Sequence, residues 1–232
     1  MWKQLKAVLF DMDGVLYDSM PNHATAWHET MLEHGFTFSI NEAYIHEGRT
    51  GPATIRLLCD RDGITITDDE ITALYAEKTE KFMRLPAPTF MTDIDKVLAK
   101  VVRDGLMPMV VTGSGYASLL DKLDTTFPGV FRRDMMVTAY DVKKGKPDPE
   151  PYLMALRKGN LKPDEAIVVE NAPLGVQSAR AAGLFVIAVN TGPLPDSYLL
   201  DAGANLLFHN MFELAEAWDE VVMGERFNCV TV

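Results

Sequence analysis

Short apolar runs recur along the chain, separated by longer segments in which apolar residues follow a helical spacing. An unbroken apolar run of about four to eight residues is typical of a strand buried on both faces of a parallel sheet. The runs predict strands at residues 7–10, 107–111, 135–139, 166–169, 185–189 and, at the sheet edge, 206–208. Helices are predicted at residues 94–103, 117–123, 152–158, 173–182 and 212–222. This alternation favours an α/β fold in which helices flank a parallel sheet.

The segment between residues 17 and 86 carries no strand pattern. Its apolar positions predict helices at residues 21–34, 41–47, 52–59 and 68–83, the second of them capped by Asn41. Because prolines hold the chain extended, residues 85–88 are expected to form a stiff linker. We therefore expect two domains, an α/β core of residues 1–16 and 87–232 and an inserted helical domain of residues 17–86.

Composition and charge narrow the range of partners. The formal net charge of −11 over 232 residues disfavours nucleic acid and anionic membranes, because both require a basic surface. No apolar run approaches the roughly 18 residues of a membrane helix, and the first strand follows the N-terminus without a signal-peptide pattern. The only two cysteines, Cys59 and Cys229, predict no disulfide framework. A cytoplasmic location is therefore expected.

Two aspartates, Asp11 and Asp13, directly follow the first predicted strand, with Gly14 behind them. Ligands of parallel sheets bind at the carboxyl ends of the strands, so these carboxylates fall where chemistry is expected. Close carboxylates repel each other unless a cation or a hydrogen-bond donor stabilises them. Their hard oxygen atoms favour Mg²⁺. The alternative, in which the Asp-Gly pair only forms a turn, is left open by these residues alone.

Three further predicted strands are followed by polar residues. These residues are Thr112, Gly113 and Ser114 after one strand, Lys146 beyond the next, and Glu170 and Asn171 after a third. Taken singly, each group also fits an ordinary turn, a solvated lysine or a helix cap. Together with the aspartates they supply a carboxylate nucleophile, an acid–base group, phosphate-binding donors and Mg²⁺ ligands. This combination indicates phosphoryl transfer.

The arrangement resembles the haloacid dehalogenase superfamily. The matching motifs are residues 11–15 (DMDGV), 112–114 (TGS), Lys146 within residues 145–149 (GKPDP), and residues 170–173 (ENAP). The helical insert lies between the first two motifs, as does the small cap of the β-phosphoglucomutase-like branch. The resemblance spans nearly the whole chain. It implies a Rossmann-like core, a helical cap and phosphoryl transfer through an aspartyl-phosphate.

The resemblance also implies a role for each motif residue. Asp11 is the implied nucleophile, and Asp13 is the implied acid for the leaving group and then the base for water. Thr112, Gly113 and Ser114 would hold the transferring phosphoryl group, and Lys146 would bridge it to Asp11. The implied Mg²⁺ ligands are Asp11, Asp13 and Asn171, with Glu170 beside the ion.

Two departures from the family pattern bear on the substrate. Asn171 stands where an acid is common, so one anionic metal ligand is missing. Gly51 stands where the mutases carry an arginine for the distal phosphate, which disfavours a bisphosphate mutase. Tyr116, at a position where the mutases tend to carry a sugar-contacting amide, favours the same interpretation. Glu47 fits a solvated helix end, but in a closed cap it would face the metal and replace the missing charge.

A cap carboxylate at the metal leaves room for a small, densely charged substrate. The chain resembles bacterial inorganic pyrophosphatases of this branch, and we expect a monomeric Mg²⁺-dependent enzyme that hydrolyses pyrophosphate. His23 and Lys78 match cap residues that face the cleft, where they are candidates for binding the substrate, as is Arg49; surface or packing roles remain open. The alternatives are a phosphatase of small sugar phosphates, a β-phosphoglucomutase, and a binding module without catalysis.

Overall fold

A computed structural model of the chain describes residues 5–114 and 117–224. Its centre is a five-stranded sheet with the order β2-β1-β3-β4-β5, in which every pair of neighbouring strands is parallel. The strands are β1 (Ala7–Phe10), β2 (Met107–Val110), β3 (Ala166–Glu170), β4 (Phe185–Val189) and β5 (Leu206–Phe208). Phe10 of β1 pairs with Val110 of β2 and Val169 of β3, so these three strands end side by side.

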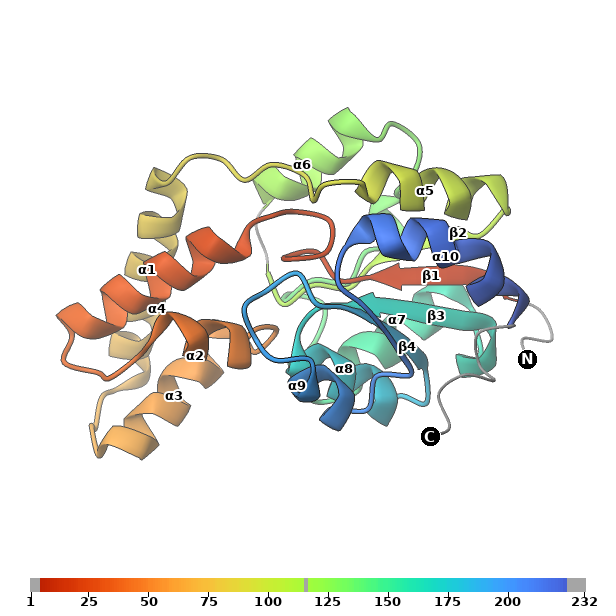
Figure 1. Cartoon of the computed structure of the whole chain (residues 1–232). Helices are drawn as coiled ribbons and strands as arrows, with labels where there is room; N and C mark the ends of the chain where they lie inside the picture. Colours follow the sequence, from red (N-terminus) through yellow and green to blue (C-terminus); the bar gives the residue numbers. More distant parts are fainter. Residues whose placement is uncertain (1–4, 115–116, 225–232) are drawn as a thin grey trace.

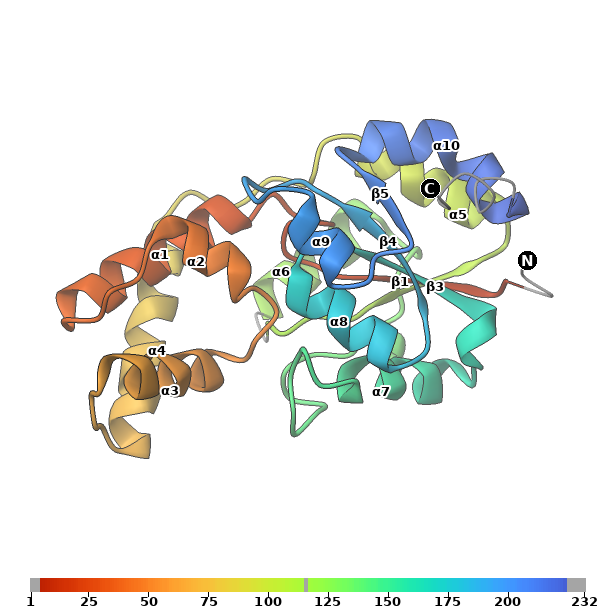
Figure 2. The same ribbon diagram turned by 60° about the horizontal axis from the view of Figure 1, so that its bottom comes forward.

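Helices cover both faces of the sheet (Figures 1 and 2). Val8 and Phe10 pack with α5 (Ile94–Arg103) and α10 (Met211–Met223) on one face. Ala7 and Leu9 point to the other face, which is covered by α7 (Glu150–Gly159), α8 (Pro173–Ala181) and α9 (Ser197–Asp201). Successive side chains of a strand point to opposite faces, so one wholly apolar strand contributes to two apolar clusters. The predicted α/β fold with a parallel sheet is confirmed.

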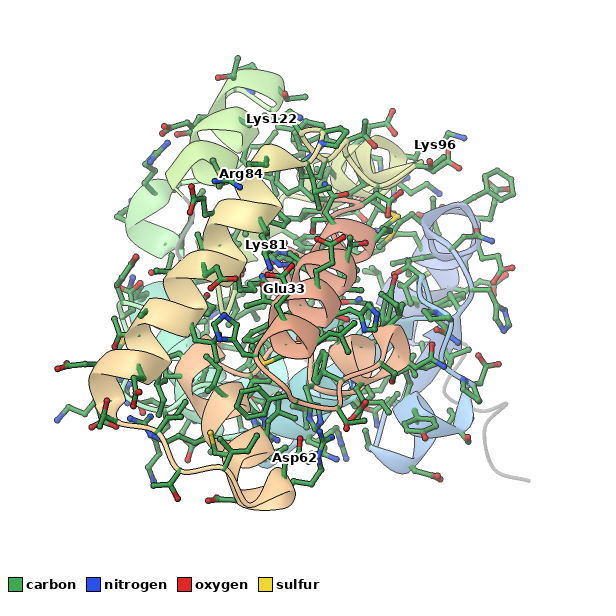
Figure 3. The ribbon with its side chains drawn as sticks, turned by 90° about the vertical axis from the view of Figure 1, so that its left-hand side faces the viewer. Glu33, Asp62, Lys81, Arg84, Lys96 and Lys122 are labelled. Atoms are coloured by element: carbon green, nitrogen blue, oxygen red, sulfur yellow. The ribbon has the colours of Figure 1, made fainter. Side chains whose placement is uncertain are left out.

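Four helices form a separate lobe beside the sheet, at the left of Figure 1, which is called the cap below. They are α1 (Met20–Glu33), α2 (Ile40–Ile45), α3 (Gly51–Asp62) and α4 (Asp68–Arg84). The cap has its own cluster of buried apolar side chains, including Met31, Ile55 and Leu58. Lys81 of α4 donates to Glu33 of α1 at 2.6 Å, and Figure 3 shows the pair between the two helices.

The predicted cap of the second helix is wrong by two residues. Ser39, not Asn41, begins α2: its hydroxyl accepts from Glu42 N at 3.2 Å, while the Glu42 carboxylate accepts from Ser39 N at 2.7 Å. This reciprocal pair satisfies two backbone donors, whereas Asn41 already lies inside the helix.

The predicted strand at residues 135–139 is also wrong. The structure has a short 3-10 helix there, Arg133–Met135, followed by a single bridge between Val111 and Val137. The chain then turns, because Asp141 Oδ2 accepts from both Thr138 N and Thr138 Oγ1 at 2.8 Å. Side-chain bonds of this kind compete with the ladder of a sheet.

The remaining helices complete the core. Helix α6 spans Ala117–Thr126, a second 3-10 helix spans Pro163–Glu165, and α9 is a short helix that the apolar pattern does not predict. Within the described residues, no helix combines the length and the apolar character needed to cross a membrane.

Candidate active site

Lys146 lies at the centre of the polar groups where β1, β2 and β3 end. Its Nζ is 2.5 Å from Asp11 Oδ1, 2.6 Å from Glu170 Oε1 and 3.1 Å from the carbonyl oxygen of Val111. The side chain is buried, and its three donors have three acceptors. Lys146 is therefore held in one position, with its charge against Asp11.

Glu170 is a hub of hydrogen bonds. Besides Lys146, Oε1 accepts from the hydroxyl of Tyr152 at 2.9 Å, while Oε2 accepts from the backbone nitrogens of Asn171 and Ala172 at 2.9 and 3.0 Å. Gly175 is required beneath it, because a Cβ there would lie 1.8 Å from Glu170 Oε1. Glu170 thus fixes both Lys146 and the turn that carries Asn171.

Asp13 is bound from both domains. Its Oδ2 accepts from Ser114 Oγ at 2.7 Å, and its Oδ1 accepts from Ser19 Oγ at 2.6 Å. His23 Nε2 lies 3.2 Å from the same Oδ1, while His23 Nδ1 lies 2.7 Å from Lys78 Nζ. The Asp13 carboxylate can only accept, so His23 donates at Nε2 and, as a neutral ring, accepts from Lys78 at Nδ1. The proton on Nε2 therefore faces Asp13.

The environment shifts the pKa of several of these groups. Burial raises the pKa of Asp11 to about 8, with Glu170 and Asp13 adding to the effect and Lys146 opposing it. Burial also raises the pKa of Asp13, but His23, Ser19 and Ser114 outweigh it and hold the net pKa below its ordinary value. Burial lowers the pKa of Lys78 to about 7.

A turn of the cap between α2 and α3 touches the core. Glu47 is buried there, and its Oε1 accepts from Asn171 Nδ2 at 3.0 Å. Burial, the charge of Asp11 and other carboxylates raise the pKa of Glu47 well above its usual value. The next residue, Gly48, fits tightly: its carbonyl oxygen would lie 2.9 Å from a Cβ at Gly113, and its own Cβ would lie 2.9 Å from Lys146 Cδ. Glycine at both positions lets the two backbones approach.

The donor set at this edge suits a hard divalent cation. Four buried carboxylates, those of Asp11, Asp13, Glu47 and Glu170, face the two buried ammonium groups of Lys78 and Lys146. Burial and the neighbouring carboxyl groups raise the pKa of Asp11 and Glu47, so ionising all four groups together is unfavourable unless a cation binds among them. Asn171 Oδ1 is buried and has no hydrogen-bond partner in the described structure. No three His, Cys, Asp or Glu side chains among the described residues are arranged to hold a metal, so amide or backbone oxygens and substrate would have to complete such a site.

A cavity of about 60 Å³ lies between cap and core. The predicted site residues Asp11, Asp13, Gly113, Ser114, His23, Lys78 and Glu47 line it. Gly51 lies in its wall against Tyr75, and a Cβ at Gly51 would be 2.0 Å from the Tyr75 ring. The arginine that the mutases carry at this position therefore has no room here.

Most of the predicted residues come together in space. Thr112 lies beside the cavity residues, where its Oγ1 accepts from Ser114 N at 2.9 Å. Lys146, Glu170 and Asn171 form the network beneath, and Arg49 lines the cavity from the cap. Tyr116 and Cys229 lie outside the described residues.

Three residues of the site, Ser19, Tyr152 and His46, are not predicted by the sequence patterns. Ser19 and Tyr152 bond directly to Asp13 and Glu170, and His46 lines the cavity. Tyr152 follows Lys146 by six residues in the same loop-and-helix segment, which is the only signal that could have suggested it. Ser19 and His46 carry no such signal, because their partners lie on other elements.

Comparisons with known proteins show that the similarity of this chain to them extends beyond the motifs. A solved structure from Bacteroides vulgatus, described provisionally as a β-phosphoglucomutase, is 57% identical with a TM-score of 0.91, and covers 95% of this chain and 90% of its own. Hexitol phosphatase A of Escherichia coli (strain K12) is 34% identical over 80% of this chain and 83% of its own length. A provisionally described pyrophosphatase PpaX of Caldanaerobacter subterraneus subsp. tengcongensis is 27% identical over 91% and 93%.

The match to a family model covers most of the chain. Residues 8–189 fit the family of haloacid dehalogenase-like hydrolases, a stretch that holds the four strand-end motifs and the whole cap. The chain therefore belongs to the haloacid dehalogenase-like hydrolase family.

Proposed function

We propose that this protein is a Mg²⁺-dependent phosphohydrolase that cleaves inorganic pyrophosphate into two phosphates. The observation that carries the proposal is Glu47, a cap carboxylate that is buried against Asn171 at the core. A carboxylate facing an anionic substrate is repulsive unless it binds a cation. Glu47 in this position compensates for the uncharged Asn171 and brings the cap close to the reacting group.

The core residues support transfer of a phosphoryl group to Asp11. An Asp11 oxygen attacks phosphorus while the bond from phosphorus to the bridging oxygen breaks, and that oxygen leaves with the electron pair and takes up a proton from Asp13. The pKa of Asp13 is low in the protein alone, so this step requires that the negative charge of the bound phosphate raise it and that Asp13 be protonated in the substrate complex. Water then attacks the phosphorus of the aspartyl-phosphate and gives a proton back to Asp13, which releases phosphate and restores Asp11. Lys146, 2.5 Å from Asp11 Oδ1, balances the charge of the transferring group.

The phosphate-binding residues Thr112, Gly113 and Ser114 fit this chemistry. They follow β2, next to the aspartates that follow β1. The hydroxyl of Thr112 holds the backbone nitrogen of Ser114 at 2.9 Å, which keeps the turn in one shape. His23 and Lys78 approach Asp13 from the cap, where His23 orients the carboxylate and Lys78 adds positive charge.

We propose that Mg²⁺ would be held by the carboxylates of Asp11 and Glu47, the side-chain oxygen of Asn171 and the backbone carbonyl oxygen of Asp13, because both carboxylate oxygens of Asp13 are already engaged with Ser19, His23 and Ser114. Asn171 contributes Oδ1, the buried oxygen without a described partner. Both oxygens of Glu170 already accept two hydrogen bonds each, so we propose that Glu170 positions the ligands rather than binding the ion directly. When bound, the ion would neutralise phosphate charge and polarise the group under attack.

The cavity favours a small substrate. The cap turn that carries Glu47 lines the cavity and is bound to Asn171 of the core at 3.0 Å, which limits the room for a sugar beside the transferring phosphoryl group. Gly51, against the Tyr75 ring, leaves no place for the arginine of a bisphosphate mutase and therefore disfavours a β-phosphoglucomutase.

A phosphatase of small sugar phosphates is the second candidate. The likeness to hexitol phosphatase A, 34% identical, favours it. Both candidate functions use the same core chemistry, but a sugar phosphate requires more room between the cap and the core than pyrophosphate does.

Release of phosphate from a panel of substrates tests the proposal. The panel contains pyrophosphate, acetyl phosphate, glucose 1-phosphate, glucose 6-phosphate and nucleotides, each with and without Mg²⁺. We expect a strong preference for pyrophosphate and its loss in Glu47→Ala. Full pyrophosphate turnover by Glu47→Ala, or equal weak activity on every sugar phosphate, would contradict the proposal. Glu29→Ala, an exposed change on α1 of the cap, serves as the matched control.

A further inference from the structure

We propose that Arg49 and His46 form a second anion subsite on the cap, which binds the phosphate group that leaves. The inference rests on the proposed pyrophosphate hydrolysis and deepens it. It assigns a specificity-determining role to two residues of the turn that also carries Glu47.

Both residues have a buried nitrogen atom that lacks a partner in the described structure. These atoms are Nε of Arg49 and Nδ1 of His46. Nearly all buried polar atoms of proteins are hydrogen-bonded, because a buried donor without an acceptor loses its hydrogen bonds to water and gains none in return, which is unfavourable in free energy. Arg49 Nε can only donate, and His46 Nδ1 donates in one of the two tautomers of the neutral ring, so the two nitrogen atoms on one short turn fit an acceptor-rich group such as a phosphate.

The position of the two residues indicates which group this is. Arg49 and His46 line the same cavity as Asp11, Asp13 and Ser114. Arg49 N donates to the carbonyl oxygen of His46 at 3.2 Å, so the two residues lie on one turn. Glu47, between them, is bound to Asn171, and Gly48 packs on Lys146. The turn thus holds the subsite in a fixed relation to Asp11.

The charges around the cavity favour an anion at this place. Lys78, the other cap cation in its wall, is engaged with His23. The guanidinium group of Arg49 forms no hydrogen bond or ion pair with any described residue, and such a group has five donors that match a phosphate. Tyr75 occupies the space beside Gly51, so Arg49 supplies positive charge from a position two residues earlier in the chain.

This placement is useful during the reaction. As the bond to the bridging oxygen breaks, negative charge increases on the departing phosphate. A positive group fixed beside it stabilises the transition state more than the ground state. A phosphate monoester has no second phosphate group to offer anionic oxygens to the subsite, so the subsite would distinguish pyrophosphate from a phosphate monoester.

The experiment compares two substrates on matched variants. Steady-state phosphate release with Mg²⁺ is measured for pyrophosphate and for p-nitrophenyl phosphate on wild type, Arg49→Gln, Arg49→Lys and His46→Phe. His46→Phe keeps the ring that stacks with Phe38 and removes its nitrogen atoms. Arg56→Gln, on the exposed side of α3 in an ion pair with Asp68, is the arginine control.

We expect Arg49→Gln to lower kcat/KM for pyrophosphate by about 10- to 100-fold, the usual range for one charge-assisted contact. The loss on p-nitrophenyl phosphate should stay below about 3-fold, and Arg49→Lys should recover part of the loss on pyrophosphate. Binding of methylenediphosphonate, measured by calorimetry with Mg²⁺, should weaken in parallel. His46→Phe should show the same selectivity with a smaller loss.

The outcomes separate the two proposals. Equal losses on both substrates in Arg49→Gln, with unchanged methylenediphosphonate binding, would overturn the subsite and leave pyrophosphate hydrolysis in place. Wild-type enzyme that fails to hydrolyse pyrophosphate would overturn the proposed function first, and the subsite with it. Thermal unfolding of each variant shows whether it is folded. If Arg49→Gln is not folded, the two substrates are compared on Arg49→Lys instead.

Discussion

The core and the cap contribute to one cavity in different ways. On the core side, two charged groups have several partners: Lys146 has three acceptors and Glu170 has four donors. On the cap side, Glu47 has one described hydrogen bond to the core, and Arg49 Nε has none among the described residues. Residues held by several hydrogen bonds keep their geometry with or without substrate. Groups with unused hydrogen-bond donors or acceptors are available to bind a ligand. We therefore expect the core residues to carry the proposed chemistry and the cap turn to influence which substrate binds.

The largest loss of activity should follow from replacing the proposed nucleophile of the core. Asp11→Asn removes the proposed nucleophile and keeps its size, so we expect turnover of every substrate to fall by at least about 1,000-fold. Stopped-flow or endpoint phosphate assays at high enzyme concentration measure this loss. Asp60→Asn, an exposed change on α3, is the control. Activity that survives in Asp11→Asn would place the chemistry elsewhere in the cavity.

The shape of the cap wall can be tested at Gly51. Gly51→Ala places a Cβ against the Tyr75 ring, and overpacking of this kind typically costs about 1–3 kcal/mol of unfolding free energy. Urea unfolding measures the cost. Backbone strain does not contribute, since Gly51 is the first residue of α3 and has no positive φ.

A double-mutant cycle supplies the control for this result. Tyr75→Leu removes the ring edge, so the penalty of Gly51→Ala should shrink in the double variant. Equal penalties with and without the Tyr75 ring would show that the ring does not define the wall.

The sequence predicted the core better than the cap, for a physical reason. Parallel strands bring their carboxyl ends together, so Asp11, Ser114 and Glu170 were expected at one edge from the strand pattern and motifs alone. The strand predicted at residues 135–139 does not form, because Asp141 accepts a hydrogen bond from the backbone nitrogen of Thr138. The apolar periodicity of the sequence does not reveal this bond. Ser19 and His46 were missed because their roles depend on how the cap packs on the core, which a local pattern does not encode.

A smaller effect should come from the support of the core network. Tyr152→Phe deletes the hydroxyl that donates to Glu170 Oε1 at 2.9 Å and keeps the buried ring. We expect kcat to fall about 3- to 10-fold and the unfolding free energy to drop by about 1 kcal/mol, the value of one hydrogen bond. Tyr140→Phe, on a residue that is 85% exposed, is the control. If Tyr152→Phe changed stability alone, Glu170 would not depend on this bond for its position.

The smallest effect should follow from loosening the loop that leads to Lys146. Asp141 holds this loop by accepting from Thr138 and from Lys158 Nζ at 2.8 Å. Burial raises the pKa of Asp141, but these bonds more than offset it and lower the net pKa below its ordinary value. We expect Asp141→Asn to lower the unfolding free energy by about 1 kcal/mol at pH 7.

The pH dependence gives the sign of this last effect. A carboxyl group with a lowered folded-state pKa stabilises the protein above its unfolded-state pKa of about 4 and loses that contribution as pH falls through its folded-state pKa. The stability difference between wild type and Asp141→Asn should therefore be constant from pH 7 to about pH 5 and shrink below about pH 4. Asp134→Asn, in an exposed ion pair with Arg132, should show little difference at any pH. A difference for Asp141→Asn that persisted at low pH would mean that its oxygens act through geometry rather than charge, and that the loop carrying Lys146 is held as a neutral turn.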